Sequence, residues 1–360
     1  MNLLQEARIE INEIDEKMAN LFVRRMQAVE KVAKYKKEHG LPVLDAAREE
    51  QVIHDNAVRV EDEALRSYYV NFIRSNMAIS RSYQHRILEG MRVAYCGTEG
   101  AFAHIATGKL FPSAQRVAYG DFVRAYRAVE EGECDAVVLP VENSYNGEVG
   151  QVTDLLFSGG LYVNAITELA VTQDLLVVPG TRPEDIRRVI SHPQALGQCA
   201  DYIRERGWDQ QEYGNTALAA EYVAKMGDRS VAAIASSEAA EIFGLQVLER
   251  NINSDRNNTT RFAVLSRSEN GVRKDVGETF ILMFTVKNEA GALAKVIDVI
   301  GRYGFNMRCL RSRPMKELMW QYYFYVEAEG CVHSAAGEAM MRDMGIFCDR
   351  LKMVGTYSRN

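Results

Sequence analysis

The sequence has six cysteines among 360 residues, and no two of them form a CxxC pair. This scatter argues against both a zinc site and a disulfide framework, and it favours reduced thiols. Cys331 and His333 could supply two metal ligands, but no second pair of ligands accompanies them. We therefore expect no metal site.

The sequence also lacks an apolar run of membrane-spanning length and an excess of positive charge. Its formal net charge is −6, which argues against a generic nucleic-acid-binding chain. Glu6, Glu10 and Glu13 interrupt the N-terminal stretch, so it does not have the pattern of a signal peptide. We expect a cytoplasmic protein of two or three domains that binds small molecules and neither nucleic acid nor membrane.

Residues 1 to 90 contain no glycine or proline before Gly40 and Pro42, and their apolar residues recur at helical spacing. The first helix could therefore run for roughly 35 residues, or ~50 Å. Because such a helix is too long to pack against one small globule, we expect a partner helix from a second subunit. Asp45 is a good N-cap for a second helix, and a third covers about residues 64 to 89.

Cationic side chains on this helical segment are spaced for a shared binding site. Arg25 and Lys36 are eleven residues apart, which places them on one helix face and ~16 Å apart. Arg8 lies ~25 Å from Arg25 and is rotated by about 100° from that face. A second chain could bring its own Arg8 to the site, whereas a single chain could not easily do so. The alternative is a set of solvated charges on amphipathic helices.

The helical segment resembles the all-helical chorismate mutase family over residues 3 to 90. Eight positions match the site of that family: Arg8, Arg25, Lys36, Asp45, Arg48, Glu49, Ser80 and Gln84. The resemblance implies an intertwined dimer of three-helix chains that rearranges chorismate, a dianion, to prephenate. Arg25 and Arg8 of the partner subunit would hold carboxylates. Lys36 and Gln84 would face the ether oxygen and Glu49 would bind the ring hydroxyl, so we expect these three to be catalytic.

Strand-like and helix-like stretches alternate from residue 92 to about residue 268, which favours an α/β domain with a largely parallel sheet. The strand-like stretches are residues 92–96, 135–141, 174–179, 188–190, 231–235 and 261–267. Neither a GxGxxG nor a GxxxxGKS/T motif occurs here, so nucleotide binding gains no support. Polar residues gather instead at strand ends, where open α/β sheets place their ligands.

Four polar stretches together resemble the prephenate dehydratase family over residues 92 to 268. They are Cys96–His104, Pro140–Ser144, Ser191–Gln194 followed by Gln198, and Asn257–Phe262. Family signatures are matched by Thr260-Arg261-Phe262, by Glu142-Asn143-Ser144 and by the Ser-His-Pro run that begins at Ser191. Two positions depart from the family, since Thr98 replaces a proline and Ala103 replaces a serine.

The resemblance implies a two-lobed enzyme that converts prephenate to phenylpyruvate, water and carbon dioxide. Aromatisation of the ring drives this reaction, so no cofactor is expected. Thr260 would donate a hydrogen bond to the departing hydroxyl as part of a polar network, and Arg261 would bind a carboxylate. His192 could be a general acid or only part of a turn. The expected substrate pocket contains Glu142, Asn143, Ser144, Ser191, Gln198, Asn215, Thr216 and Arg261.

Residues 278 to 360 follow a strand–helix–strand–strand–helix–strand order, which is typical of the ferredoxin-like α+β fold. With Gly291-Ala292-Leu293 at the start of its first helix, the segment resembles the ACT regulatory domain. The resemblance implies a homodimer or tetramer with a phenylalanine site between subunits, formed by Gly291, Ala292, Leu293, Ser312 and Arg313. Arg311 stands where the family has a glutamate. A dimerisation module without a ligand is the alternative.

Two other functions agree with these observations. The dehydratase could also accept arogenate, and kcat/KM for both substrates would separate the two cases. The chain could instead be an amino-acid-binding regulator, because a fold does not determine a function. The cations of the helical segment argue against a regulator, since a sensor does not need them. We therefore expect a bifunctional enzyme of phenylalanine biosynthesis that phenylalanine inhibits.

Overall fold

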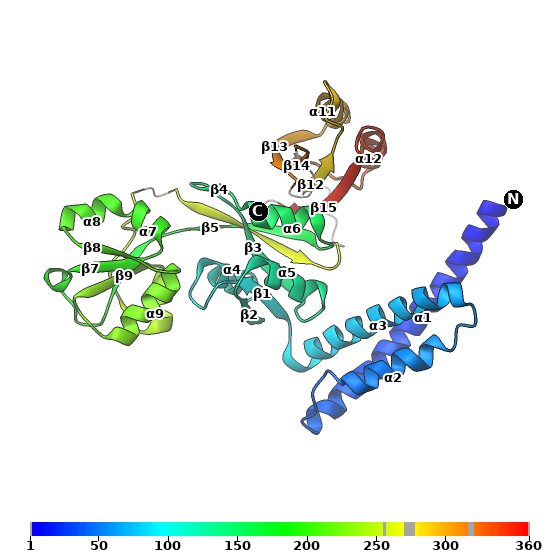
Figure 1. The fold of residues 1–360 in the computed structure, drawn as a ribbon, viewed down its shortest axis with the longest axis horizontal. Coiled ribbons are helices and arrows are strands. Elements are labelled where there is room, and N and C mark those ends of the chain that lie inside the picture. Colours follow the sequence, from blue (N-terminus) through cyan, green and yellow to red (C-terminus); the bar gives the residue numbers. More distant parts are fainter. Residues whose placement is uncertain (1, 255–256, 270–277, 316–319, 359–360) are drawn as a thin grey trace. The chain divides into compact units, whose positions relative to one another are not determined.

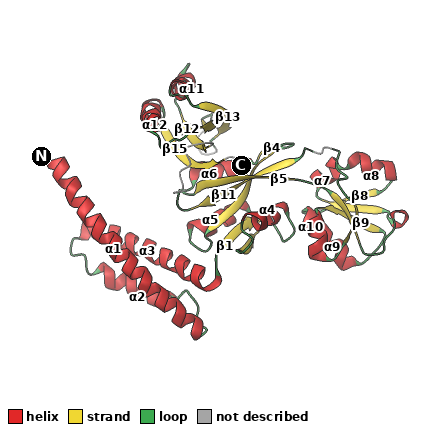
Figure 2. Ribbon diagram, turned by 180° about the vertical axis from the view of Figure 1, so that it is seen from behind, coloured by secondary structure: helices red, strands yellow, loops and turns green. Residues whose placement is uncertain are grey.

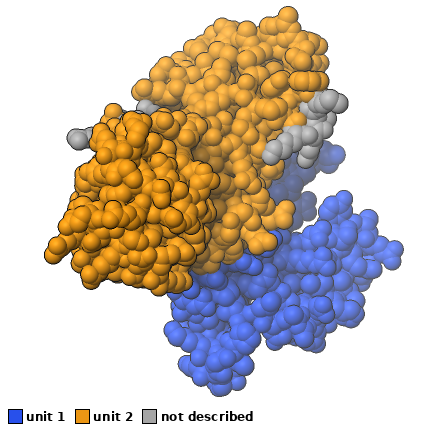
Figure 3. Space-filling view, turned by 60° about the vertical axis from the view of Figure 1, so that its left-hand side comes forward, with its two compact units in different colours: residues 1–92, 113–115, 131–135 blue, residues 93–112, 116–130, 136–360 orange. Residues whose placement is uncertain are grey.

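The computed structural model describes residues 2–254, 257–269, 278–315 and 320–358. The chain divides into two compact units (Figure 3). The first unit comprises residues 1–92 with two short segments, 113–115 and 131–135, and the second unit comprises the remainder. None of the described helices is both long enough and apolar enough to cross a membrane.

Three helices make up most of the first unit: α1 (Leu3–Glu38), α2 (Ala46–Ala57) and α3 (Glu63–Glu89) (Figure 1). Each helix begins at a polar N-cap whose side chain accepts a hydrogen bond from a backbone N–H, namely Asn2, Asp45 and Asp62. The length of α1 and the cap at Asp45 agree with the expectation from the sequence. α3 ends at Gly90, whose φ of 82° suits a residue without a side chain.

These helices bury little apolar surface within one chain. Ala33 and Met77 are the buried hydrophobic residues of the three described helices, whereas Leu21 is 59% exposed. The other exposed hydrophobic residues include Leu4, Ile11, Ile14, Met18, Phe22, Phe72 and Ile79. A bundle with so small a core of its own indicates that another apolar surface packs against it.

The second unit contains two lobes, and the chain visits them in the order first, second, first. The strands of the first lobe are β1 (Arg92–Cys96), β2 (Gln115–Tyr119), β3 (Ala136–Asn143), β4 (Gly147–Glu148), β5 (Tyr162–Ala170) and β11 (Thr259–Ser266). Its helices are α4 (Phe102–Leu110), α5 (Phe122–Glu130) and α6 (Gly150–Ser158). The chain leaves this lobe after β5 and returns to it before β11 (Figure 2).

A five-stranded sheet of order β10-β6-β9-β7-β8 forms the second lobe. Its strands are β6 (Asp174–Val177), β7 (Arg188–Ser191), β8 (Asp209–Glu212), β9 (Val231–Ala235) and β10 (Gln246–Glu249). Its helices are the short η1 (Pro183–Asp185), α7 (Pro193–Gln198), α8 (Ala200–Arg206), α9 (Thr216–Met226) and α10 (Ser237–Phe243). Leu175 packs in a core with α7 and α8, and its neighbour Leu176 packs in a core with α9 and α10. Because adjacent strand residues face opposite sides, helices cover both faces of this sheet.

The sheets are mixed rather than largely parallel, which corrects the expectation from the sequence. β1 is parallel to β3, and β7 is parallel to β8 and β9. However, β11 is antiparallel to β3 and β5, and β6 is antiparallel to β9 and β10. β5 carries the chain out of the first lobe and β11 carries it back. These two strands are neighbours in the sheet and run in opposite directions. A local sequence pattern does not encode this pairing.

The C-terminal segment has the expected order of elements. They are β12 (Glu278–Thr285), α11 (Ala292–Arg302), β13 (Asn306–Pro314), β14 (Tyr322–Glu329), α12 (Ala335–Phe347) and β15 (Arg350–Ser358). The strands pair in the order β13-β14-β12-β15, and both helices pack in one core against β12 (Figure 1). β15 also pairs with β5, at Gly355 and Val163. A Cβ on Gly355 would lie 2.0 Å from the Val163 oxygen, so glycine permits this pairing, which joins the C-terminal strands and those of the first lobe into one sheet.

Candidate active sites

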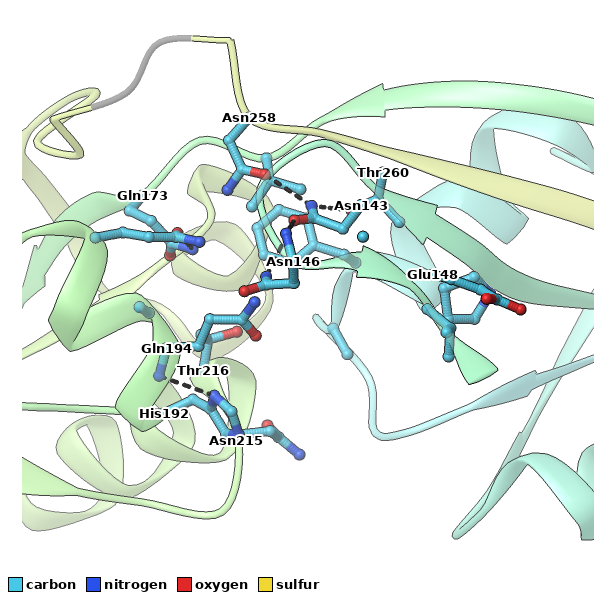
Figure 4. A pocket seen from close by; sticks show the side chains of 18 residues that line it. Asn143, Asn146, Glu148, Gln173, His192, Gln194, Asn215, Thr216, Asn258 and Thr260 are labelled. Carbon is cyan, nitrogen blue, oxygen red and sulfur yellow. Dashed lines mark hydrogen bonds between the residues drawn. The ribbon is translucent and has the colours of Figure 1, made fainter. Parts of the chain in front are cut away.

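A cavity of about 360 Å³ lies between the two lobes of the second unit (Figure 4). One wall, at the ends of β3 and β11, carries Asn143, Asn258 and Thr260. The facing wall, at the starts of α7 and α9, carries His192, Gln194, Asn215 and Thr216. Gln173 and Gln198 also line the cavity, and no lysine or arginine does so in the described part of the chain.

Thr260 is buried at the start of β11, where it lies opposite Asn143 of β3. Asn143 Nδ2 donates to Thr260 Oγ1 over 2.9 Å and to Asn258 Oδ1 over 2.7 Å. Asn143 is itself held in place, because its Oδ1 accepts from the backbone N–H groups of Tyr145 and Asn146. Since Thr260 Oγ1 already accepts a hydrogen bond, its own hydrogen is left for donation to a ligand.

Helix N-termini supply positive potential to the cavity. α4 begins after Ala101 without a side-chain cap, so its first N–H groups can bind a carboxylate. α9 begins beside the cavity at its N-cap Asn215. His192 is the N-cap of α7, and its Nδ1 accepts the N–H of Gln194 over 3.2 Å. In the neutral ring this bond leaves the hydrogen on Nε2, as a donor.

The amide side chains of Asn258 and Gln173 in the cavity wall each have one atom without a hydrogen bond to the described residues. Asn258 Nδ2 and Gln173 Oε1 are buried, and neither has a hydrogen-bond partner among the residues that the structure describes. Buried polar groups are normally hydrogen-bonded, so these atoms indicate a polar ligand or water in the cavity. A donor and an acceptor in one cavity wall fit a ligand that carries both carboxylate and hydroxyl groups.

The cavity brings Thr260 together with four of the residues expected around prephenate, namely Asn143, Gln198, Asn215 and Thr216. Two other expected residues have structural contacts instead. Ser144 Oγ accepts from Thr259 N over 3.0 Å, and the buried Ser191 Oγ donates to Ile234 O. The sequence alone did not indicate Gln173, Gln194 and Asn258 as cavity residues. Gln194 and Asn258 nevertheless lie inside the polar stretches that marked this segment.

Arg261 and Glu142 face away from the cavity, because neighbouring residues of a strand point to opposite sides. Arg261 Nη1 donates to Glu142 Oε2 over 3.0 Å and to Glu327 Oε1 over 3.1 Å, and Nη2 donates to Glu327 Oε2 over 3.0 Å. Arg311 of β13 donates to the other carboxylate oxygen of Glu142. Burial would raise the pKa of Glu327, but the hydrogen bonds and charge of Arg261 outweigh it and hold this pKa below its ordinary value.

The helical unit brings Arg25, Ser80 and Gln84 together. Arg25 Nη1 donates to Ser80 Oγ and, over 3.3 Å, to Asn76 O. Gln84 Nε2 donates to Ser80 O over 3.3 Å, while its buried Oε1 has no hydrogen-bond partner within the described residues. Burial lowers the pKa of Arg25, which also lines a cavity of about 890 Å³ between α1 and α3.

The remaining residues expected in the mutase site make local contacts. Lys36 Nζ donates to Val43 O over 2.6 Å, and Arg48 Nη1 donates to Gln51 Oε1 over 3.2 Å. Asp45 is the N-cap of α2, and Arg8 is exposed on α1. Glu49 pairs with Arg81 of α3, whose Nη1 lies 2.6 and 2.5 Å from its two oxygens. The sequence alone did not indicate Arg81 as a site residue, although Arg81 directly follows Ser80.

A small cavity of about 110 Å³ lies beside the start of α11. Leu293 lines it together with Glu289, Trp320, Tyr322 and Phe324. Gly291 precedes Ala292, the first residue of α11, in the left-handed conformation with φ of 80° and without a side-chain cap. Ser312 is exposed on β13, and Arg313 Nε donates to Asp154 Oδ1 of α6 over 3.1 Å.

The cysteine and histidine residues form no metal centre in the described ranges, where no group of three or more His, Cys, Asp or Glu side chains could hold an ion. His333 Nε2 lies within hydrogen-bond distance of the Glu269 carboxylate. All six cysteines are free thiols. Burial raises the pKa of Cys199 to about 12, which keeps that thiol protonated and unreactive.

Two family models match the chain: chorismate mutase type II over residues 7–85 and prephenate dehydratase over residues 93–270. A bifunctional chorismate mutase/prephenate dehydratase of Enterobacter agglomerans is 29% identical over 99% of this chain and 96% of its own. The arogenate dehydratase/prephenate dehydratase 6 of Arabidopsis thaliana is 34% identical over 74% of this chain and 68% of its own.

Two solved structures match this chain with a TM-score of 0.69 and cover 75% of it. One is GqqA, described as a novel type of quorum quenching acylase, at 30% identity over 98% of its own chain. The other is a prephenate dehydratase of Arthrobacter aurescens in complex with L-Phe, at 24% identity over 90% of its own chain, and it shows the same fold. The fold and the matches define a chain that joins a helical mutase-type domain to a two-lobed dehydratase. The chain belongs to the prephenate dehydratase family and carries an N-terminal chorismate mutase type II domain, which confirms the resemblance found in the sequence.

Proposed function

We infer that this chain is a bifunctional enzyme of phenylalanine biosynthesis. The helical unit rearranges chorismate to prephenate, and the second unit converts prephenate to phenylpyruvate, water and carbon dioxide. The observation that carries the dehydratase activity is the Asn143–Thr260 pair in a cavity with unpaired amide groups and helix N-termini. The relative that spans both domains supports the combination of activities in one chain.

The dehydratase cavity offers hydrogen bonds where the reaction develops charge. The Thr260 hydroxyl donates a hydrogen bond to the oxygen of the ring hydroxyl of prephenate as the C–O bond of that hydroxyl breaks. The electrons of the bond between the ring and its carboxylate move into the ring and carbon dioxide departs. The released hydroxide takes up a proton, which solvent supplies through the donors of the cavity, and becomes water. The Nε2–H of His192 is a second donor in this cavity. The uncapped start of α4 takes the role of carboxylate ligand that the sequence analysis gave to Arg261.

The mutase site is built from α1 and α3 and is completed by a second chain. Arg25 and Arg8 of the partner subunit hold the two carboxylates of chorismate, and Gln84 offers its unpaired amide oxygen to the site. Lys36 contributes a cation near the bond that breaks. The exposed apolar faces of α1 and α3 support an intertwined dimer, because such a partner would cover them.

The proposal also includes regulation and location. L-Phenylalanine binds at the small cavity beside Gly291 and Leu293 and inhibits the dehydratase, in a homodimer or tetramer of cytoplasmic chains. The L-Phe complex of the structural relative and the ACT-like order of elements support the effector. Free thiols at all six cysteines support a reducing compartment.

Arogenate is a second candidate substrate, because the plant relative is named for both substrates. Arogenate carries an amino group where prephenate carries a keto group, and the reaction at the ring is the same. A comparison of kcat/KM for the two compounds decides between them. A ratio above about 100 in favour of prephenate corresponds to nearly 3 kcal/mol of discrimination.

The proposed function is tested with purified full-length protein and two separate substrates. Chorismate should be consumed with formation of prephenate, and added prephenate should give phenylpyruvate at a rate that L-phenylalanine lowers. Phenylalanine affinity by calorimetry without turnover of either substrate would instead identify an amino-acid-binding regulator.

A further inference from the structure

Two consecutive residue pairs in the β3–β11 ladder divide between two faces of the sheet. Thr260 lies opposite Asn143, and Arg261 lies opposite Glu142. The first pair lines the cavity, while the second makes ion pairs on the other side. Each cavity residue is therefore one peptide bond away from a charged residue that contacts a different part of the fold.

The charged pair is bound to three strands of the C-terminal sheet. Arg261 contacts Glu327 of β14 through two hydrogen bonds and Tyr357 of β15 through one of 3.0 Å. Glu142 uses one oxygen for Arg261 and the other for Arg311 of β13. The side chains of Glu327 and Arg261 are 2% and 18% exposed, and those of Glu142 and Arg311 are 25% exposed, so the Glu327 end of the network is shielded from water and the Arg311 end is partly shielded. Breaking one contact would leave a buried charge without its partner.

The charges of this network balance, with two arginines and two glutamates. Arg311 is one of the two cations in this balance. A glutamate at position 311 would face the Glu142 carboxylate with a like charge, whereas arginine bridges to it. Arg313, two residues further along the same side of β13, makes a parallel contact with Asp154 of α6.

We propose that Arg311, Glu142 and Arg261 are positioning residues, through which strand β13 of the C-terminal sheet sets the place of Thr260 in the dehydratase cavity. The proposal rests on the dehydratase function given above and assigns Glu142 and Arg261 a role other than binding substrate. β13 also carries Ser312 and Arg313, which the resemblance to the ACT domain assigns to the effector site, so the same strand would connect effector binding to the catalytic hydroxyl.

Arg311→Met in the full-length protein tests the proposal, with Arg308→Met as the matched control. Arg308 lies on the same strand but pairs with the half-exposed Glu329, within the C-terminal sheet. Arg311→Met should lower the dehydratase kcat about tenfold with KM changed less than about twofold, because a displaced catalytic group costs rate rather than binding. L-phenylalanine should then have at most half of its effect on the rate. Arg308→Met should keep the wild-type values.

Two further variants sharpen this test. Arg311→Lys keeps the charge and should recover most of the lost kcat. Glu142→Gln should lower kcat about as much as Arg311→Met, and the double variant should be no worse than either single variant, since both act through one contact. A rise in KM at unchanged kcat for Glu142→Gln would overturn the proposal, because it would identify Glu142 as a substrate ligand. Equal effects of Arg311→Met and Arg308→Met would also overturn it.

A structural readout separates this proposal from the proposed function. Hydrogen exchange of the β11 amides, residues 259–266, should be faster in Arg311→Met than in Arg308→Met, whether or not prephenate is the substrate. Wild-type protein without dehydratase activity would refute the function and leave this readout as the test of the contact. Unchanged β11 exchange in Arg311→Met would overturn the positioning role.

Discussion

The helical unit and the two-lobed unit hold their functional residues in different ways. In the two-lobed unit, Thr260 lies on β11, a strand with buried residues on both of its faces. Asn143 from the neighbouring strand donates a hydrogen bond to the Thr260 hydroxyl. In the helical unit, Arg25 and Gln84 lie on helices whose buried hydrophobic residues, in the described part of that unit, are Ala33 and Met77. The dehydratase cavity is lined by residues of the second unit, whereas the proposed mutase site needs Arg8 of a second chain.

This difference predicts independent responses to mutation. A change at the dehydratase cavity should spare the mutase, because the cavity is lined by residues of the second unit alone. A change in the helical unit should spare the dehydratase for the corresponding reason. Changes at subunit contacts should affect the helical site first, since the proposed partner would cover its exposed apolar faces.

Thr260→Val should have the largest effect. This nearly isosteric change removes the donor and should lower the dehydratase kcat by roughly 10³, within the range for loss of a positioned proton donor. Steady-state assays of both activities on the same preparation measure it. A parallel loss of mutase activity would contradict the separation of the two sites.

Arg25→Ala should lower the mutase kcat/KM by about 10² to 10³, which corresponds to the roughly 3 to 4 kcal/mol lost when a charged hydrogen-bonding partner is removed. The dehydratase rate on added prephenate should stay within about twofold of wild type. Arg24→Ala, next to it on α1, is the matched control and should leave both rates near wild type. Equal losses of mutase activity in the two variants would show that Arg25 does not bind the substrate.

The acid stability of the second unit should depend on Glu327. Its pKa lies below the ordinary value of 4.5, so its stabilising contribution is complete above that value and is lost as the pH falls through the lowered pKa. Thermal unfolding between pH 7 and pH 3 should show a falling Tm for wild type and a flatter profile for Glu327→Gln. The variant should also unfold at a lower temperature at pH 7, by several degrees. Identical pH profiles would show that the Arg261–Glu327 contact does not contribute.

Ser144→Ala should have the smallest effect on catalysis. Its hydroxyl joins the β3 turn to Asn257 and Thr259 and does not line the cavity. We expect kcat/KM for prephenate to change less than about threefold, with a loss of about 1 kcal/mol of stability. A change in kcat/KM above about 30-fold at unchanged stability would show that Ser144 belongs to the substrate pocket after all.

The sequence predicted the helices of the first unit well, because local features define their limits. Asp45 caps α2 as expected, and the uninterrupted run before Gly40 forms α1. The order of elements in the C-terminal segment follows from its alternating patterns in the same way. The orientation of β11 could not be predicted, since it depends on where the chain re-enters the first lobe.

The features of the candidate sites that the sequence could not predict also depend on contacts between distant parts of the chain. Strand alternation shows that Thr260 and Arg261 face opposite sides, but only the packing of the C-terminal sheet shows which side holds the cavity. The pairing of Arg81 with Glu49 could not be predicted from the sequence, because the two residues lie on different helices. Gln173 follows β5 at the passage between the lobes, where no motif marks it.

The central claim is that the mutase site needs two chains and the dehydratase site needs one. Arg8→Ala and Arg25→Ala proteins, each inactive as a mutase, should be mixed, unfolded and refolded together. If Arg8 acts on the partner's site, random dimers regain about a quarter of the wild-type mutase activity, because one site in each mixed dimer is intact. Dehydratase activity per chain should be equal in the mixture and the separate variants. Mixed dimers that form but recover no mutase activity would contradict the account.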